Sequence, residues 1–170
     1  MDLVPAGDAL RAQGKLEWPK SGLTMSLAGF QHVFSEAKEV DVGGGLRFKV
    51  APPRVQALLK MGSYLDDPYG RQKDIEDFQR LLQMYEADSD RVFSDPVFDA
   101  GLADIQLASA FLLGYDMREI ITEPDQQLID AFLAQAGATL ECVPATDLEG
   151  RNTETFRSQL FAFAKGLRGR

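Results

Sequence analysis

The sequence predicts an α+β fold, with a few strands near its start and mostly helices afterwards. Apolar residues alternate with polar ones over residues 40 to 50, around a run of three glycines, which is typical of a β-hairpin. From residue 53 onward, apolar residues recur instead at the spacing of amphipathic helices. We therefore expect a small sheet or hairpin packed by about six helices.

The chain has the size and composition of one globular domain. It has 170 residues, of which 45% are hydrophobic and 26% are charged. We find no internal repeat, and no linker long enough to divide two domains. We expect a single domain over residues 1–170, with a strand-containing part at 1–50 and a mainly helical part at 51–170.

The first 38 residues predict two short strands and one helix. Residues 2–5 have the pattern of the tail of a strand, because two apolar residues precede a proline. A second short strand is expected at residues 16–18. Apolar residues at helical spacing then predict a helix over residues 26–38, with Ser26 as its N-cap.

The hairpin is the clearest strand signal. Its turn is the glycine run 43–45, and the apolar residues on its two sides are expected to form one matched face. These residues are Val40, Val42, Leu46, Phe48 and Val50.

The remainder of the chain predicts helices and one late strand. Proline at the first helical position does no harm, because its missing N–H would have no partner there. The expected helices cover residues 53–65, a segment that begins after residue 70 and reaches Tyr85, and residues 99–114, 124–136 and 155–167. Gly114 is expected at the C′ position of its helix, and residues 138–143 are expected to form a short strand.

Charge and composition exclude several classes of protein. The net charge of −8 argues against a broad surface for duplex nucleic acid, which needs a basic face. No apolar run approaches the ~20 residues of a membrane span, and the amino end has no signal-peptide pattern. We therefore expect a cytoplasmic protein without a membrane partner. Cys142 is expected to be a buried thiol and His32 a structural residue.

The candidate chemistry lies around the junction of the two central helices. Lys60 is on the polar side of the first helix, and Arg71, Lys73, Asp74 and Asp77 open the second. Asp74 and Asp77 are three residues apart, so they share one face of that helix. The group is either a helix-stabilising charge cluster or a binding site.

Five short patterns occur in a fixed order along residues 1 to 120. They are Met1-Asp2-Leu3-Val4-Pro5-Ala6-Gly7; Trp18-Pro19 with Met25, Gly29-Phe30 and Ala37; Ala57-Leu58-Leu59-Lys60; Arg71, Lys73, Asp74 and Asp77 as R-x-K-D-x-x-D; and Leu112-Leu113-Gly114-Tyr115-Asp116. In this order they resemble the nucleotidyltransferases of the abortive-infection (AbiEii-like) toxin type, known from toxin–antitoxin systems, within the polymerase β-like superfamily.

The resemblance implies a magnesium-dependent transferase that acts on ATP or another nucleoside triphosphate. It makes Asp2 a metal ligand and catalytic carboxylate, and Lys60 a catalytic residue that contacts the phosphates. Arg71, Lys73, Asp74 and Asp77 would join Lys60 in binding the nucleotide. The cofactors that it implies are Mg²⁺ and a nucleoside triphosphate, if the protein is active.

The sequence departs from this family at the catalytic motifs. No Gly-Ser loop with an Asp-x-Asp pair precedes Asp2. Asp66 and Asp67 are adjacent, so their side chains cannot point together from a strand, and Asp88 and Asp90 fall in an expected loop. We expect the chain to be incomplete or inactive as a transferase.

Three alternatives follow. The gene begins upstream and the catalytic strands are missing, or the protein is a non-catalytic relative that binds a nucleotide weakly. In the third, it is an interaction module whose exposed first strand pairs with a protein partner or with a second copy.

Overall fold

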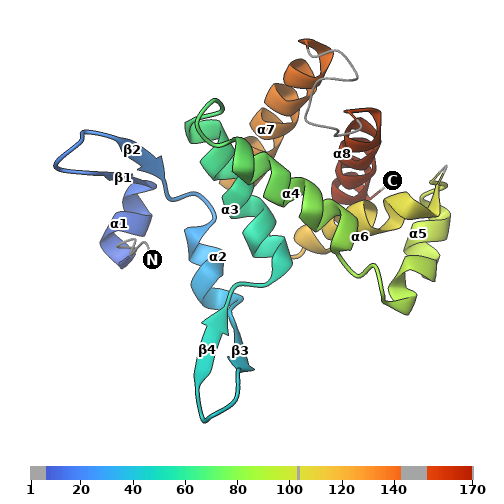
Figure 1. Ribbon diagram of the computed structural model, residues 1–170, viewed down its shortest axis with the longest axis horizontal. Helices are drawn as coiled ribbons and strands as arrows, with labels where there is room; N and C mark the ends of the chain where they lie inside the picture. The colour runs from blue at the N-terminus through green and yellow to red at the C-terminus, as the bar shows by residue number, and fades with distance from the viewer. Residues whose placement is uncertain (1–6, 103, 143–152, 170) are drawn as a thin grey trace.

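The computed structural model describes residues 7–102, 104–142 and 153–169. Within these residues it contains eight α-helices and two separate two-stranded antiparallel sheets (Figure 1). The expected α+β class is therefore confirmed. The expected strand at residues 2–5, and with it Asp2, lies outside the described residues.

The amino-terminal part holds the first sheet and two short helices. Helix α1 (Asp8–Gln13) leads into β1 (Lys15–Glu17), which pairs with β2 (Thr24–Ser26) and is followed by α2 (Phe30–Ser35). The strand expected at 16–18 is confirmed one residue earlier, whereas α1 was not expected.

The expected helix at 26–38 is too long at both ends. Ser26 does not cap it, because this residue pairs with Lys15 in the first sheet. The helix starts after Gly29, which has φ 78° and would place a Cβ 2.9 Å from the Leu58 side chain. Glycine is therefore needed there both for its backbone conformation and for the close approach.

The second sheet is the expected hairpin. Strand β3 (Lys38–Asp41) pairs with β4 (Arg47–Val50), with Val40 opposite Phe48. Figure 1 shows that this hairpin extends away from the helical body.

The helical body is formed by five longer helices. They are α3 (Pro53–Asp66), α4 (Gln72–Met84), α6 (Ala108–Met117), α7 (Glu123–Cys142) and α8 (Thr153–Arg168). Their aromatic residues meet edge to face in the centre, where Phe78 of α4 contacts both Phe132 of α7 and Phe163 of α8. Each of these rings is fully buried.

The helix expected at 99–114 is confirmed only from residue 108 onward. The chain instead forms a 3₁₀ turn (η1, Asp90–Phe93), α5 (Asp95–Asp99), a second 3₁₀ turn (η2, Ile105–Leu107) and then α6. Gly114 is inside α6 rather than at its C′ position, because the helix packs its backbone directly against α8 there.

The expected strand at 138–143 is also wrong for the residues that can be compared. Helix α7 continues through Cys142, so residues 138–142 extend the helix expected over 124–136. A strand would need a neighbour for its backbone groups, whereas the helix satisfies them within itself. Val143 and the side chain of Cys142 lie outside the described part. The terminal helix is confirmed as α8.

Within the described residues, we find no helix whose length and apolar character would allow it to span a bilayer.

Candidate functional site

The candidate site is formed where α3 lies beside the start of α4. Lys60 and Ser63 are three residues apart on α3, so they share a face of that helix. Asp74 and Asp77 share a face of α4 in the same way. The two faces meet, so Lys60 contacts Asp74 and Asp77, as the sequence predicted.

The Lys60 ammonium group is the centre of this cluster. Its Nζ donates hydrogen bonds to Asp74 Oδ1 at 2.7 Å and to Asp77 Oδ2 at 2.8 Å. The second oxygen of Asp74 accepts a bond from Ser63 Oγ at 2.8 Å. Arg71 is a weaker partner, with its Nη1 3.8 Å from Asp74 Oδ2.

The electrostatics of the cluster keep its charges in place at neutral pH. Burial lowers the pKa of Lys60, but the hydrogen bonds to Asp74 and Asp77 more than offset this effect and raise it above the ordinary value. The bond from Lys60 in turn lowers the pKa of Asp77. Lys60 is therefore a fixed cation and is unsuited to act as a general base.

A cavity of about 250 Å³ opens beside the cluster. Its polar lining consists of Ser26, Lys60, Ser63, Asp66, Arg71 and Asp74. Asp66 connects the first sheet to α3, because its Oδ2 accepts a hydrogen bond from the Ser26 backbone N–H at 2.8 Å. The cavity thus lies between the β1–β2 sheet and the α3–α4 pair, and we call it the α3–α4 pocket.

Two residues expected at the site, Lys73 and Asp2, are not among those that the structure places there. Lys73 is exposed and does not line the α3–α4 pocket, although its charge helps to lower the pKa of Asp77. The position of Asp2 is not described. The structure therefore brings together four of the expected residues, namely Lys60, Arg71, Asp74 and Asp77.

The described carboxylates do not fit a magnesium site of their own. Both oxygens of Asp74 already accept bonds from Lys60 and Ser63, and Asp77 is paired with Lys60. Among the described residues, no group of three His, Cys, Asp or Glu side chains is placed to hold a metal ion. A magnesium ion needs about six oxygen ligands, which these paired side chains do not supply.

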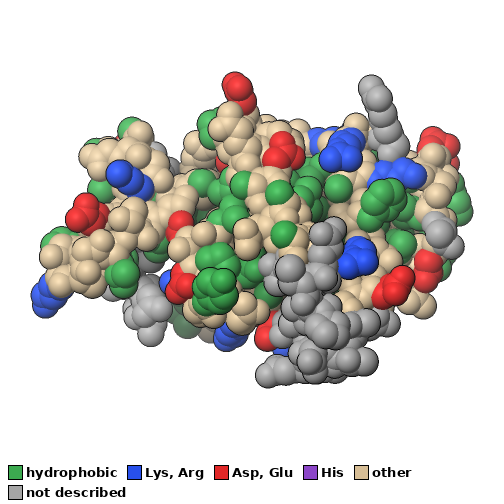
Figure 2. All heavy atoms as spheres, turned by 90° about the horizontal axis from the view of Figure 1, so that it is seen from above, with side chains coloured by type: hydrophobic (Ala, Val, Ile, Leu, Met, Phe, Trp, Pro, Cys, Tyr) green, Lys and Arg blue, Asp and Glu red, His purple; other side chains and the backbone are tan. Residues whose placement is uncertain are grey.

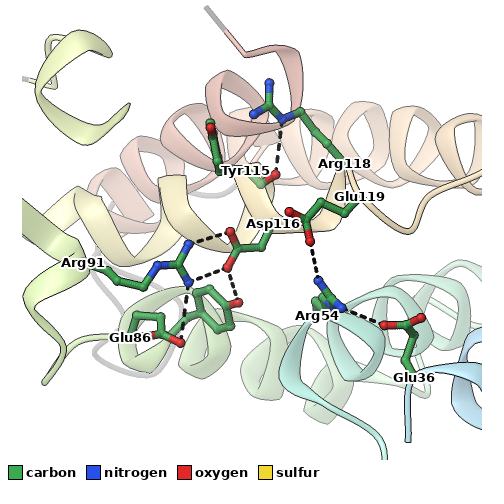
Figure 3. A network of polar contacts seen from close by, with 9 residues as sticks. Glu36, Arg54, Glu86, Arg91, Tyr115, Asp116, Arg118 and Glu119 are labelled. Carbon is green, nitrogen blue, oxygen red and sulfur yellow. Dashed lines mark hydrogen bonds and ion pairs between the residues drawn. The ribbon is translucent and has the colours of Figure 1, made fainter. Parts of the chain in front are cut away.

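A second polar network surrounds Asp116 on α6, and Figure 3 shows it from close by. Arg91 donates to both Asp116 oxygens at 2.7 Å, and the Tyr85 hydroxyl donates to Oδ2 at 2.5 Å. Burial raises the pKa of Asp116, but the bonds from Arg91 and Tyr85 outweigh it and lower the pKa. Burial, reinforced by the bond to Asp116, raises the pKa of Tyr85. The carboxylate stays ionised and the phenol stays protonated, which suits a structural clamp between α4, η1 and α6.

Arg54 extends this network toward α2. Its guanidinium group donates to Glu36 at 2.7 Å and to Glu119 at 3.0 Å. A cavity of about 460 Å³ lies beside it, lined also by Glu86, which has φ 55°. The arginines that line this cavity are both paired with carboxylates, so we do not assign it a ligand.

The buried His32 has a partner that the sequence did not suggest. Its Nε2 lies 2.8 Å from Asp125 Oδ2, which also accepts bonds from the Thr122 N–H and hydroxyl at the start of α7. Burial raises the pKa of Asp125, yet these bonds more than offset it and lower the pKa. The Thr-x-x-Asp spacing of residues 122–125 is a capping-box signal and could have been read from the sequence.

The charge pattern of the surface can be followed in Figure 2. On the described part of that face, Lys and Arg side chains lie in small groups between Asp and Glu side chains.

Comparisons with known proteins identify no relative. The chain matches no protein-family model, no curated protein and no solved structure.

Proposed function

We propose that this chain is a nucleotidyltransferase-like protein whose α3–α4 pocket binds the phosphate groups of a nucleoside triphosphate. The observation that carries the proposal is the convergence of Lys60, Arg71, Asp74 and Asp77 beside a cavity. These residues form the central pattern of the resemblance, and a shared binding role for them requires that they meet.

The chemistry of the pocket supports phosphate as the ligand. A lysine ammonium group has three N–H donors, and Lys60 uses two of them on Asp74 and Asp77. The third remains for a ligand oxygen. Arg71 lines the same pocket and is half exposed, and among the described residues its one ion pair is the weak contact with Asp74. Arginine suits phosphate because its planar group can donate two parallel bonds.

The α4 helix adds a favourable field. Arg71 is its N-cap and Asp74 is in its first turn, so the pocket opens beside the positive end of the helix dipole. The volume of about 250 Å³ is below the ~300 to 1,000 Å³ of typical ligand sites. The pocket therefore suits a phosphate chain, with the nucleoside outside it.

The proposal is limited to binding. Asp2, the expected catalytic carboxylate, is outside the described residues, and the described carboxylates do not fit a metal site. The engagement of Asp74 and Asp77 by Lys60 and Ser63 favours the non-catalytic nucleotide-binding alternative for the described part of the chain. The acidic lining residues Asp66 and Asp74 oppose an anion, so we expect weak binding, with a dissociation constant of roughly 0.1 to 1 mM.

The competing explanation is that the cluster only holds α3 against α4. If Lys60 is purely structural, its hydrogen bonds to Asp74 and Asp77 account for its role and no ligand is required. The two explanations differ at Arg71, because this residue contributes little to the cluster but lines the pocket.

Isothermal titration calorimetry with ATP and with inorganic tripolyphosphate tests the proposal, each with and without magnesium. Arg71→Ala is expected to weaken binding by roughly tenfold, since a charged hydrogen bond contributes about 1.5 kcal/mol or more. Lys73→Ala is the matched control, because it removes the same charge from the same helical turn outside the pocket. We expect it to change the affinity by no more than about twofold.

Two results would count against phosphate binding in the pocket. The first is the absence of heat with either ligand at millimolar concentration. The second is an equal loss of affinity in both variants, which would indicate a general charge effect. Circular dichroism of both variants checks that the fold is retained.

A further inference from the structure

The β3–β4 hairpin has one apolar face and one charged face. Successive side chains in a strand point to opposite sides, and residues directly opposite in the pairing share a side. Val40 lies opposite Phe48 and Lys38 opposite Val50, while the Val42 N–H bonds to the Leu46 carbonyl oxygen. The apolar residues of both strands therefore fall on one face, as the sequence predicted.

This apolar face is not covered by the described part of the protein. Its residues are Val40 (41% exposed), Val42 (59%), Leu46 (59%), Phe48 (55%) and Val50 (42%). The two strands pair only with each other in the described residues, and the hairpin extends away from the helices (Figure 1). A contiguous exposed apolar surface on a polar frame marks an interaction site.

The charged face shows what kind of partner would fit. Arg47 is paired across the hairpin with Glu39 at 2.9 Å and with Asp41 at 3.8 Å. Lys49 makes no hydrogen bond or ion pair with the residues that the structure describes. The two basic residues of this face, Arg47 and Lys49, are both on β4, whereas its two carboxylates, Glu39 and Asp41, are on β3. The third basic residue of the hairpin, Lys38, lies opposite Val50 on the apolar face. The outer edge of β4 is thus basic and carries an unused cation.

We propose that the hairpin is a docking site for an extended segment of another protein, which adds a strand along the outer edge of β4. The segment alternates apolar and acidic residues. Its apolar side chains continue the row of Leu46, Phe48 and Val50, and its carboxylates lie beside Arg47 and Lys49. Backbone hydrogen bonds to the open edge supply affinity, and the alternation supplies specificity.

The charges disfavour edge-to-edge strand pairing with a second copy of the chain. Antiparallel pairing of β4 with β4 of a second copy, with the apolar faces matched, puts Arg47 opposite Lys49. The equivalent pairing of β3 puts Glu39 opposite Asp41. A β3–β4 pairing between copies avoids both repulsions, but it is not self-complementary and does not close as a dimer.

Fluorescence anisotropy with two labelled peptides tests the proposal on the full chain. The probes are a ten-residue peptide that alternates valine with glutamate and one that alternates valine with lysine. We expect the acidic peptide to bind at least about tenfold more tightly, in line with ~1.4 kcal/mol of charge preference. Phe48→Glu should lower its affinity by at least about tenfold. Lys49→Glu should remove or reverse the preference between the peptides.

Phe161→Glu is the matched control, because Phe161 is an exposed phenylalanine (70%) on α8. It should leave peptide binding within about twofold of the parent chain. Equal binding of both peptides, or of neither, overturns the proposal, as does a preference that survives Lys49→Glu. Light scattering provides a further outcome: a dimer that Phe48→Glu dissociates overturns it in favour of a second copy.

Discussion

The close crossing of α6 and α8 predicts that alanine at either of its two glycines destabilises the fold. Gly114 of α6 and Gly166 of α8 face each other's helix so closely that the two backbones touch. A Cβ added at Gly114 would collide with the Phe163 carbonyl oxygen and lie 3.0 Å from the Leu167 nitrogen. A Cβ at Gly166 would meet the backbone of α6 in the same way. Replacement of either glycine by alanine must therefore move the helices apart.

The expected magnitude follows from two opposing effects. Overpacking of a core costs typically about 1 to 3 kcal/mol, and the upper end applies here because the colliding atoms are backbone. Alanine returns about 1 kcal/mol through its higher helix propensity. We expect Gly114→Ala to lower the free energy of unfolding by about 2 kcal/mol, which corresponds to a fall in Tm of roughly 4 to 8 °C.

Urea denaturation followed by circular dichroism measures this effect. Gly137→Ala is the matched control, because Gly137 is also inside a helix, and a Cβ added there would meet no described atom of a neighbouring element within 4 Å. It should stabilise the protein by about 0.5 to 1 kcal/mol. If Gly114→Ala is as stabilising as Gly137→Ala, the reasoning about the helix crossing is refuted.

Three further predictions concern the ion pairs and hydrogen bonds of charged side chains. Arg91→Ala should cost about 2 kcal/mol in urea denaturation, because it removes both bonds that the guanidinium donates to Asp116; a loss below about 0.5 kcal/mol would contradict the clamp. Asp125 has a lowered pKa in the folded protein. Its contribution to the free energy of unfolding is therefore present above pH ~3.9, the pKa of an unfolded aspartate, and is lost as the pH falls through its folded pKa. Asp125→Ala should therefore reduce the loss of unfolding free energy at acid pH, measured by urea denaturation at several pH values. The same pH dependence in the variant and the parent would contradict this prediction. Lys60→Met should raise the pKa of Asp77 in a carbon-13 NMR titration, since Lys60 lowers it.

The hairpin and the two central helices were predictable because their signals are local. Alternation around the glycine run is unaffected by the rest of the fold, and the residues of β3 and β4 pair as that pattern requires. The exposure of the apolar face was not predictable. Alternation tells which side chains share a face, but it does not tell whether anything covers that face.

The wrong predictions came from local signals that tertiary packing overrode. Gly114 follows an apolar run, as a C′ glycine does, yet its absent side chain serves the contact with α8. The short apolar run after residue 137 suits either a strand or a buried helix, and α7 simply continues through it.

The candidate site was predictable in part. Helical spacing places Asp74 and Asp77 on one face, and the short connection from α3 brings Lys60 to them. The clamp between Arg91 and Asp116 was not found, because the two residues are 25 positions apart and no local pattern relates them. Only the packing of α4 and η1 on α6 brings them together.

NMR of the lysine ammonium groups in nitrogen-15-labelled protein tests the proposed contact between Lys60 and a nucleotide phosphate directly. Two bonds to carboxylates should slow proton exchange at Lys60 and make its signal visible, unlike that of the exposed Lys73. Addition of ATP is expected to shift the Lys60 signal. A Lys60 signal that stays in place at millimolar ATP would contradict phosphate binding in the α3–α4 pocket.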